Sequence, residues 1–306
     1  MSNLLKQKNF LNYRHDIFLR LFFFVTLLLG YFVTYSFSVS SENYKWKETV
    51  LTARTYFGTN VRADFPNDPC VRGLVYLSNF KDSSARKLFS AMKDPGVCGP
   101  ITDWVFAELD IRSGHLDKGH DKFLVLLKNY PKFYLADVTL AETLYFKKEY
   151  KRAFELADSL VKKGKEETSE DIFVDANLMA GANLAMVVHN GSLWTKITNG
   201  RKILPYLLTA EKLRPDSAEV LLGLGTFYLF SPSIVGGDLK KAEVYLKNAV
   251  AKKPLFPDAY ARLGQYYQKK GDQVKFKENL DHALKLNPHS ILANDIKTRK
   301  CDFICP

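Results

Sequence analysis

The sequence contains none of the short motifs that mark common catalytic sites. It has no Gly-x-Ser-x-Gly nucleophile elbow, no His-Glu-x-x-His zinc pair and no phosphate loop. Gly223 and Gly225 lack the third glycine of a dinucleotide loop and follow no strand, so they are interpreted as packing glycines in a helix. His115 and His120 stand where a polar turn is expected. We therefore expect no enzyme activity, no cofactor and no bound metal.

Strand patterns are missing as well. From Ser41 to the C-terminus no convincing run alternates polar and apolar residues, and the apolar spacing is helical. Apolar residues make up 46% of the 306 residues, which is enough to bury a sizeable core. The sequence therefore predicts an all-α protein.

A concentrated basic surface is also absent. The formal net charge is +11, but the lysines occur as scattered pairs such as Lys162-Lys163 and Lys240-Lys241. Lysines late in a helix interact favourably with its negative end, so most pairs are interpreted as solvated helix ends. No nucleic-acid partner is expected.

The N-terminus has the character of an export signal. Residues 21–33 contain no charged side chain, weaker apolar character continues to Val39, and four basic residues precede the run. This order is typical of a signal peptide and also of a membrane anchor spanning residues 17–39. Both alternatives stay open for residues 1–40. Either way the remainder is expected to be exported to the periplasm, soluble or tethered to the inner membrane.

The expected location decides how the four cysteines are interpreted. Cys70, Cys98, Cys301 and Cys305 form an even set in a compartment expected to be oxidising, which favours disulfides. Of the three connectivities, we favour the local one, which joins Cys70 to Cys98 and Cys301 to Cys305.

A repeat of helix pairs is the strongest positive signal. Pro254 and Pro288 lie 34 positions apart. Between them stand large, small and aromatic residues at fixed helical spacings: Tyr260, Leu263, Gly264, Tyr267, Phe276, Leu280 and Ala283. These positions resemble the tetratricopeptide repeat (TPR). The resemblance implies an α-solenoid that binds or scaffolds other proteins.

The same pattern of residues recurs upstream in the chain. The small residue late in the first helix of each unit recurs at Gly73, Ala107, Ala141, Gly181, Gly225 and Gly264. Its counterparts in the second helices are Ala85, Gly119, Ala153, approximately Ile203, Ala242 and Phe276. We therefore predict about six TPR-like helix pairs over residues 66–290, preceded by a helical cap at 41–65 and closed by a tail at 291–306.

Two units carry extra residues in the turn between their helices. The fourth has an insertion around Asn190 to Trp194, and the fifth has one within Ser231 to Asp238. Turns of neighbouring units lie on one edge of a solenoid, so the two insertions are expected side by side. Pro205, which falls within the second helix of unit four, predicts a kink or a late helix start.

The inner face of the solenoid is predicted to be a mostly apolar groove. Positions that hold lysine and asparagine in carboxylate-clamp TPR proteins hold other residues here, such as Trp104 and Glu108, which disfavours that mode of recognition. An uncovered apolar strip of this length is unusual, so residues 42–60, the C-terminal tail, a partner helix or an apolar ligand should fill it. The expected binding residues are Trp104, Tyr145, Phe146, Met186, Leu229 and Phe230 in the groove, with Trp194, Ile234, Gly236, Gly237 and Asp238 on the loop edge.

A second, narrower resemblance concerns the C-terminal half. Ser231 to Asp238, the helix after it and Asn294 resemble the exported TPR proteins associated with TRAP-type transporters (TatT-like). That resemblance implies a cavity for apolar or organic-acid ligands, although the lipid-anchor cysteine of that group is absent.

Together these observations predict an exported TPR adaptor that binds a protein partner through its groove. The first alternative is a transporter accessory protein that handles a small apolar ligand. The second is a hydrolase built from the inserted loops and His189.

Overall fold

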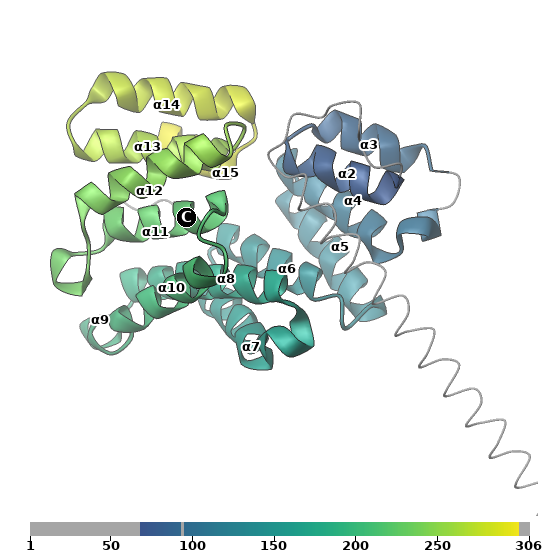
Figure 1. Ribbon diagram of the computed structural model, residues 1–306, viewed down its shortest axis with the longest axis horizontal. Coiled ribbons are helices and arrows are strands. Elements are labelled where there is room, and N and C mark those ends of the chain that lie inside the picture. The colour runs from purple at the N-terminus through teal and green to yellow at the C-terminus, as the bar shows by residue number, and fades with distance from the viewer. Residues whose placement is uncertain (1–67, 93–94, 300–306) are drawn as a thin grey trace, which may run out of the picture. The chain divides into compact units, whose positions relative to one another are not determined.

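The computed structural model describes residues 68–299, apart from residues 93 and 94 (Figure 1). All of them belong to a unit that begins at Thr49. The predictions for the signal or anchor at 1–40, the cap at 41–65 and the Cys301–Cys305 bridge lie outside the described residues.

Six antiparallel helix pairs follow one another along the chain, as predicted (Figure 1). The pairs are α2 (Pro69–Ser78) with α3 (Asp82–Ser90), α4 (Pro100–Arg112) with α5 (Leu116–Asn129), α6 (Tyr134–Phe146) with α7 (Tyr150–Thr168), α8 (Glu170–Asn190) with α10 (Ile203–Leu213), α11 (Ala218–Phe230) with α12 (Leu239–Lys252), and α13 (Pro257–Lys269) with α14 (Gln273–Leu286). Shorter elements are η1 (Pro95–Cys98), α9 (Leu193–Asn199), η2 (Gly200–Lys202), η3 (Ser233–Val235) and the closing helix α15 (Ile291–Thr298). The described residues contain no strand, and the all-α solenoid is confirmed.

Small residues allow the two helices of each pair to approach closely. A Cβ atom built on Gly73 would lie 2.2 Å from Cε2 of Phe89, and one built on Gly225 would lie 2.7 Å from Cγ of Leu246. Real Cβ atoms do not come that close, so these positions exclude any larger residue without movement of the partner helix. The repeat template located these contact points correctly.

Helix starts and stops follow local chemistry. The Asp68 carboxylate accepts a hydrogen bond from the amide of Cys70 at 2.7 Å, and the Asp272 carboxylate accepts one from the amide of Lys275 at 3.0 Å. Pro205 stands in the first turn of α10, where the missing amide hydrogen costs nothing. The late helix start predicted for unit four is therefore confirmed.

Helix α8 is long and apolar enough to cross a membrane by length and composition alone. It packs against α6, α7 and α10 as the first helix of unit four. Its buried asparagines donate within the helix, and the Asn183 side chain, for example, donates to the carbonyl of Met179 at 2.9 Å. We interpret α8 as a core helix of the repeat array.

A disulfide joins Cys70 in α2 to Cys98 in η1. It ties the first helix pair to the segment that leads into α4. This half of the predicted connectivity is confirmed.

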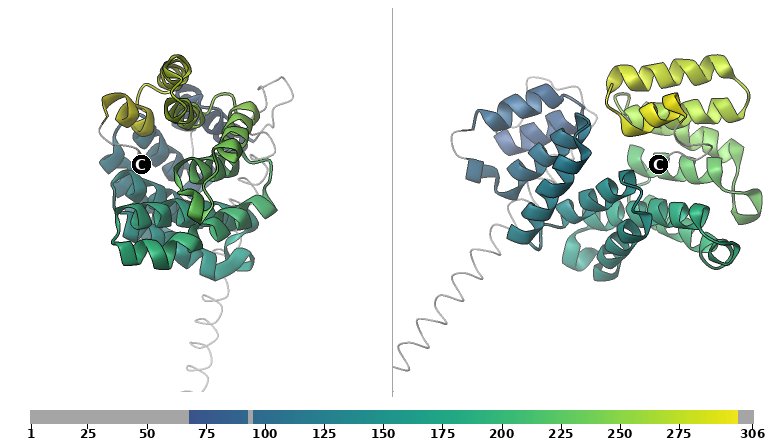
Figure 2. Two further views of the ribbon diagram at one scale, coloured as in Figure 1. Left: turned by 90° about the vertical axis from the view of Figure 1, so that its left-hand side faces the viewer. Right: turned by 180° about the vertical axis from the view of Figure 1, so that it is seen from behind.

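The array curves, so that the loop after α2 in the first pair lies against the segment that precedes α13 in the last pair (Figure 2). Phe80, which follows α2, stacks on Phe256, which precedes α13, with ring centroids 6.2 Å apart. The Arg112 guanidinium lies 4.7 Å and the Lys253 ammonium 5.5 Å from the centre of the Phe80 ring. Phe80 takes a left-handed backbone conformation, with φ of 54°, at this contact. Aromatic and cation–π contacts therefore connect units that are distant in sequence.

Two glycines of α11 test the close-approach argument. Gly225→Ala is expected to lower the free energy of unfolding by about 1–3 kcal/mol, because the new methyl group would overlap Leu246. Gly223→Ala is the matched control in the same helix, since its methyl group would meet only side-chain ends, Cδ2 of Leu178 at 3.2 Å and Cδ2 of Leu207 at 3.6 Å. We expect that variant to be neutral or stabilised by up to roughly 1 kcal/mol, the helix preference of alanine. Chemical denaturation measures both values, and equal losses would contradict the argument.

Candidate binding groove

An apolar cavity opens among α8, α10, α11 and the two insertions. Its volume is about 400 Å³. Three of the predicted groove residues, Tyr145, Met186 and Phe230, line it together. Other lining residues come from α8, α10 and α11 and are mainly small or apolar: Gly181, Ala182, Ala185, Val188, Ile203, Leu207, Gly223 and Phe227. The small residues of α8 and α11 leave the space that larger side chains would fill.

Arg262 of α13 supplies a buried positive charge to this cavity. The residue is only 5% exposed, and its guanidinium lies 5.4 Å from the centre of the Phe230 ring. It donates a hydrogen bond to the Gln265 side-chain oxygen at 2.8 Å and one to the Tyr145 hydroxyl at 3.5 Å. Burial raises the pKa of Tyr145, although the nearby guanidinium opposes that shift, so the phenol stays protonated at neutral pH.

Arg262 was not among the residues predicted from the sequence. The predicted groove positions came from the first five units, and the curvature that brings α13 beside α6 and α11 is not visible in the repeat pattern. An arginine on the packed face of a helix, between Ala261 and Leu263, was the available signal, because arginine is seldom buried without a role.

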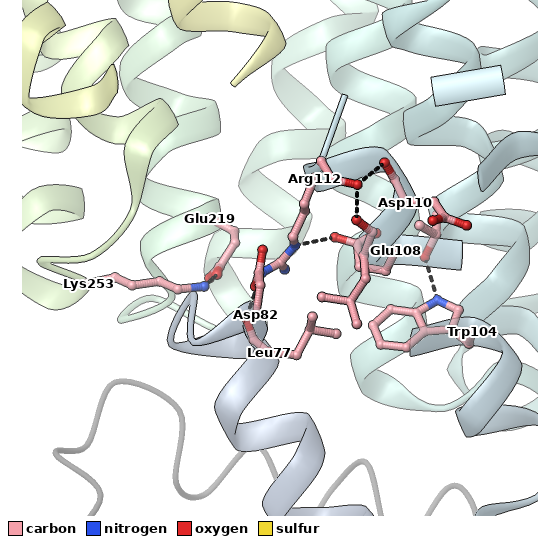
Figure 3. A network of polar contacts seen from close by, with 11 residues as sticks. Leu77, Asp82, Trp104, Glu108, Asp110, Arg112, Glu219 and Lys253 are labelled. Atoms are coloured by element: carbon pink, nitrogen blue, oxygen red, sulfur yellow. Dashed lines mark hydrogen bonds and ion pairs between the residues drawn. The ribbon is translucent and has the colours of Figure 1, made fainter. Parts of the chain in front are cut away.

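A second part of the inner face is charged, contrary to the prediction of a mostly apolar groove. Arg112 is at its centre, with a side chain only 17% exposed (Figure 3). Its guanidinium donates to the carbonyl of Leu77 at 2.6 Å and forms ion pairs with Asp82 at 3.2 Å and Glu108 at 2.8 Å. Phe146, a predicted groove residue, lines this charged region, which encloses about 220 Å³.

Acidic residues gather around Arg112. Burial raises the pKa of Glu142 to about 8, and the negative charges of Glu108 and Asp258 add to the shift. Glu219 behaves oppositely: burial opposes its ionisation, but its ion pair with Lys253 at 2.8 Å prevails and lowers its pKa to about 2. The inner face thus divides into an apolar part and a charged part.

The remaining predicted groove residues, Trp104 and Leu229, contact neighbouring helices. The Trp104 indole donates a hydrogen bond to the Thr139 hydroxyl at 2.9 Å, which links α4 to α6 (Figure 3). Leu229 is fully buried, at 0% exposed. Neither residue lines the apolar cavity.

The two insertions lie side by side, as expected from their positions in the turns. Lys196 and Gly200 from the first, and Pro232 and Val235 from the second, line the same cavity. The insertions therefore form one side of its opening.

The Gly-Gly-Asp sequence has a local structural role. Gly236 has a φ of 103°, and a Cβ atom on Gly237 would lie 1.8 Å from the carbonyl oxygen of Ser231. Asp238 caps α12, where its carboxylate accepts from the amides of Lys240 at 2.9 Å and Lys241 at 3.2 Å. By contrast, Trp194 is 73% and Ile234 is 88% exposed.

Few of the residues that line the apolar cavity are titratable. Among the described residues that line it, the titratable ones are Tyr145, His189, Lys196 and Arg262. Ser231 also lines the cavity, and the described lining residues include no carboxylate that could orient His189 toward it. Within the described part of the chain, no group of three or more His, Cys, Asp or Glu side chains is placed to hold a metal ion.

Comparison with solved structures decides the fold. Over 66% of this chain and 98% of the other, the structure is similar to TTC0263, a thermophilic TPR protein of Thermus thermophilus, with 19% sequence identity and a TM-score of 0.53. This chain has the tetratricopeptide-repeat fold.

Weaker similarities reach other TPR proteins. The Cut9–Hcn1 assembly of APC/C has a TM-score of 0.47 at 15% identity, covering 85% of this chain and 47% of that one. YrrB, a TPR protein with an unusual peptide-binding site, has a TM-score of 0.33 at 20% identity, covering 70% and 96%. No protein-family model matches the chain, and neither does any curated protein. None of the three structures is a transporter accessory protein, so the TatT-like resemblance stays a prediction.

The raised pKa of Glu142 predicts a pH-dependent stability. Between its ordinary pKa of 4.5 and about 8, the folded protein holds a proton that the unfolded chain has lost, so unfolding becomes easier as pH rises. The glutamine in Glu142→Gln cannot ionise, so this variant does not lose stability in that way as pH rises. We expect the melting temperature of the variant, relative to wild type, to increase from pH 5 to pH 8.

Glu166→Gln, at an exposed position of α7, is the control for that measurement. Its difference from wild type should stay constant across the same pH range. A Glu142→Gln difference that does not change with pH would show that the carboxyl group is ionised in the folded protein.

Proposed function

We propose that this chain is an exported TPR adaptor that holds an apolar, acidic-ended segment of a protein partner in the cavity lined by Tyr145, Met186 and Phe230. The observation that carries the proposal is the combination of an apolar cavity of about 400 Å³ with the buried guanidinium of Arg262. Apolar walls supply affinity by burying surface from water, and a few fixed polar groups supply orientation.

The charges around the cavity favour an acidic group on the occupant. Arg262 lies inside, and Lys196 and His189 belong to the lining from the insertion side. No acidic side chain lines the cavity among the described residues. Among the lining residues a carboxylate on the occupant would therefore meet neutral or positive groups, in a place where charge interactions are stronger than in water, although Asp258 lies near enough to act on Arg262 and Tyr145. This mode differs from the carboxylate clamp, because the cation comes from α13 and most of the residues that line the cavity are apolar.

A small apolar organic acid is the second candidate, as the TatT-like resemblance implies. The same cavity supports it, because its volume falls in the range of small-molecule sites. Residues 42–60, which were considered as a filling for the groove, lie outside the described residues.

Export is part of the proposal, and the disulfide between Cys70 and Cys98 supports it. Disulfides persist mainly in oxidising compartments such as the periplasm. The four basic residues that precede the apolar stretch at the N-terminus also support export.

A dye titration tests the cavity. The dye 1-anilinonaphthalene-8-sulfonate combines an aromatic body with one negative charge, so we expect one molecule to bind the folded protein with increased fluorescence. Ala182→Trp should fill the cavity and weaken binding at least about 10-fold, equivalent to 1.4 kcal/mol. Ala251→Trp, on the exposed surface of α12, is the matched control and should bind as wild type does. Equal binding by all three proteins would refute the cavity as the site.

Two further measurements separate the candidate functions. Selection from a peptide library should enrich apolar, acidic-ended peptides on wild type and on Ala251→Trp but not on Ala182→Trp. Native mass spectrometry of the purified full chain would instead reveal a small acid if the protein is a ligand carrier. An organic acid bound to wild type, without peptide enrichment, would replace the adaptor by the carrier.

A further inference from the structure

Four large apolar side chains project from the two insertions. Leu193 is 74%, Trp194 is 73%, Ile197 is 61% and Ile234 is 88% exposed. We refer to these four residues as the edge patch. Other strongly exposed apolar residues, such as Val244 and Val274, occur singly on the outer helices, as is normal for a protein surface, and Leu124 with Val125 form only an adjacent pair.

The fold does not need the edge patch for its core. No residue of α9, which carries three of the four side chains, is buried. The tryptophan in particular is an expensive residue to leave in water, because it exposes a large apolar area.

The two parts of the edge patch belong to one surface. A Cβ atom on Gly200, at the end of the first insertion, would lie 4.0 Å from Val235 of the second. The ribbon views show α9 and the turn before α12 projecting from the same edge of the array (Figures 1 and 2). The insertions also line one cavity.

Basic residues surround the edge patch. Residues 192–202 and 231–241 contain five basic side chains and one acidic one. The basic residues are all exposed: Lys196, Arg201, Lys202, Lys240 and Lys241. The acidic one, Asp238, is engaged in capping α12. This local excess contrasts with the scattered lysine pairs elsewhere, most of which lie beside acidic partners, such as Lys162 with Asp158.

We propose that the edge patch is a docking surface for an anionic lipid bilayer. Tryptophan, leucine and isoleucine enter the boundary between headgroups and acyl chains, while lysine and arginine bind the phosphates around them. Each basic residue near an anionic membrane strengthens that attachment electrostatically. The proposal is independent of what the apolar cavity binds.

The shape of the edge patch favours a membrane over a protein partner. Residues that dominate protein interfaces usually insert into fitted pockets and are surrounded by a rim that excludes water. Here the side chains project from a helix of seven residues and a turn. A fluid bilayer needs no complementary pocket, so protruding apolar side chains with a basic surround suit it better.

Brominated lipids provide the test, because bromine quenches tryptophan fluorescence only at short range. The full chain is mixed with vesicles of phosphatidylcholine and brominated phosphatidylglycerol. The fluorescence of Trp194 is obtained by subtracting the fluorescence of Trp194→Phe from that of wild type. This subtraction removes the signals of Trp46 and Trp104. We expect at least half of the Trp194 fluorescence to be quenched.

Salt and charge variants test the role of the basic residues. Raising the salt from 0.1 M to about 1 M shortens the screening length from roughly 10 Å to 3 Å, so the quenching should fall at least twofold. The triple variant Arg201→Gln, Lys202→Gln, Lys240→Gln, which leaves the cavity lining unchanged, should show a similar loss at low salt. Vesicles of neutral brominated phosphatidylcholine should quench less than the anionic ones.

The matched control moves the tryptophan to another exposed apolar position. Val274→Trp in the Trp194→Phe background places it on α14, where Val274 is 69% exposed. Its fluorescence should remain unquenched. Equal quenching at both positions would indicate unspecific adsorption, and an unquenched Trp194 with bound vesicles would assign the edge patch to a protein partner; either result overturns the proposal.

Discussion

The close approach of paired helices is the contact on which the rest of the structure depends. Gly73, Gly119, Gly181 and Gly225 stand where a Cβ atom would overlap the other helix of the same pair. Close packing at these points places the first helix of every unit on the inner face, and the stacking of units then curves the array. That curvature brings Phe80 against Phe256 and carries Arg262 of α13 to Tyr145 of α6. Both regions of the inner face exist because of it.

The two regions of the inner face differ in how their side chains are accommodated. Around Arg112, charged groups are gathered with only part of their surface removed from water, and each carboxyl group responds to its own surroundings: Glu219, whose side chain is 44% exposed, stays ionised beside Lys253, while burial keeps Glu142 neutral. Such a network stabilises one geometry more than it adds net stability, because desolvation opposes the ion pairs. In the apolar cavity the side chains do not fill the space between the helices. Small residues of α8 and α11 leave space beside Phe230, and that space is what an occupant would fill.

The insertions connect the cavity to the surface. Their backbone is fixed by local devices, including the left-handed Gly236 and the Asp238 cap, so the exposed side chains are presented by an ordered frame. Lys196 and Val235 face the cavity, whereas Trp194 and Ile234 face outward. One short stretch of chain thus serves an inner binding surface and an outer one, and the two proposals can be tested separately on it.

The sequence by itself determined the helix pairs and their small contact residues, because each depends on neighbours within about forty positions. It favoured the local Cys70–Cys98 bridge among three connectivities and left a kink or a late start open at Pro205, which the structure then decided. It also placed the insertions on one edge, since turns of a solenoid repeat in register. Only the tertiary structure decided which inner positions line the cavity: Leu229 became core, the half-buried Trp104 bonded to Thr139 of α6, and Arg262 entered the cavity. It also decided that Arg112, Glu142 and Asp258 would meet in a charged region. These outcomes depend on the curvature summed over six units, which no single repeat encodes, because a small change in each crossing angle moves distant units by many ångströms.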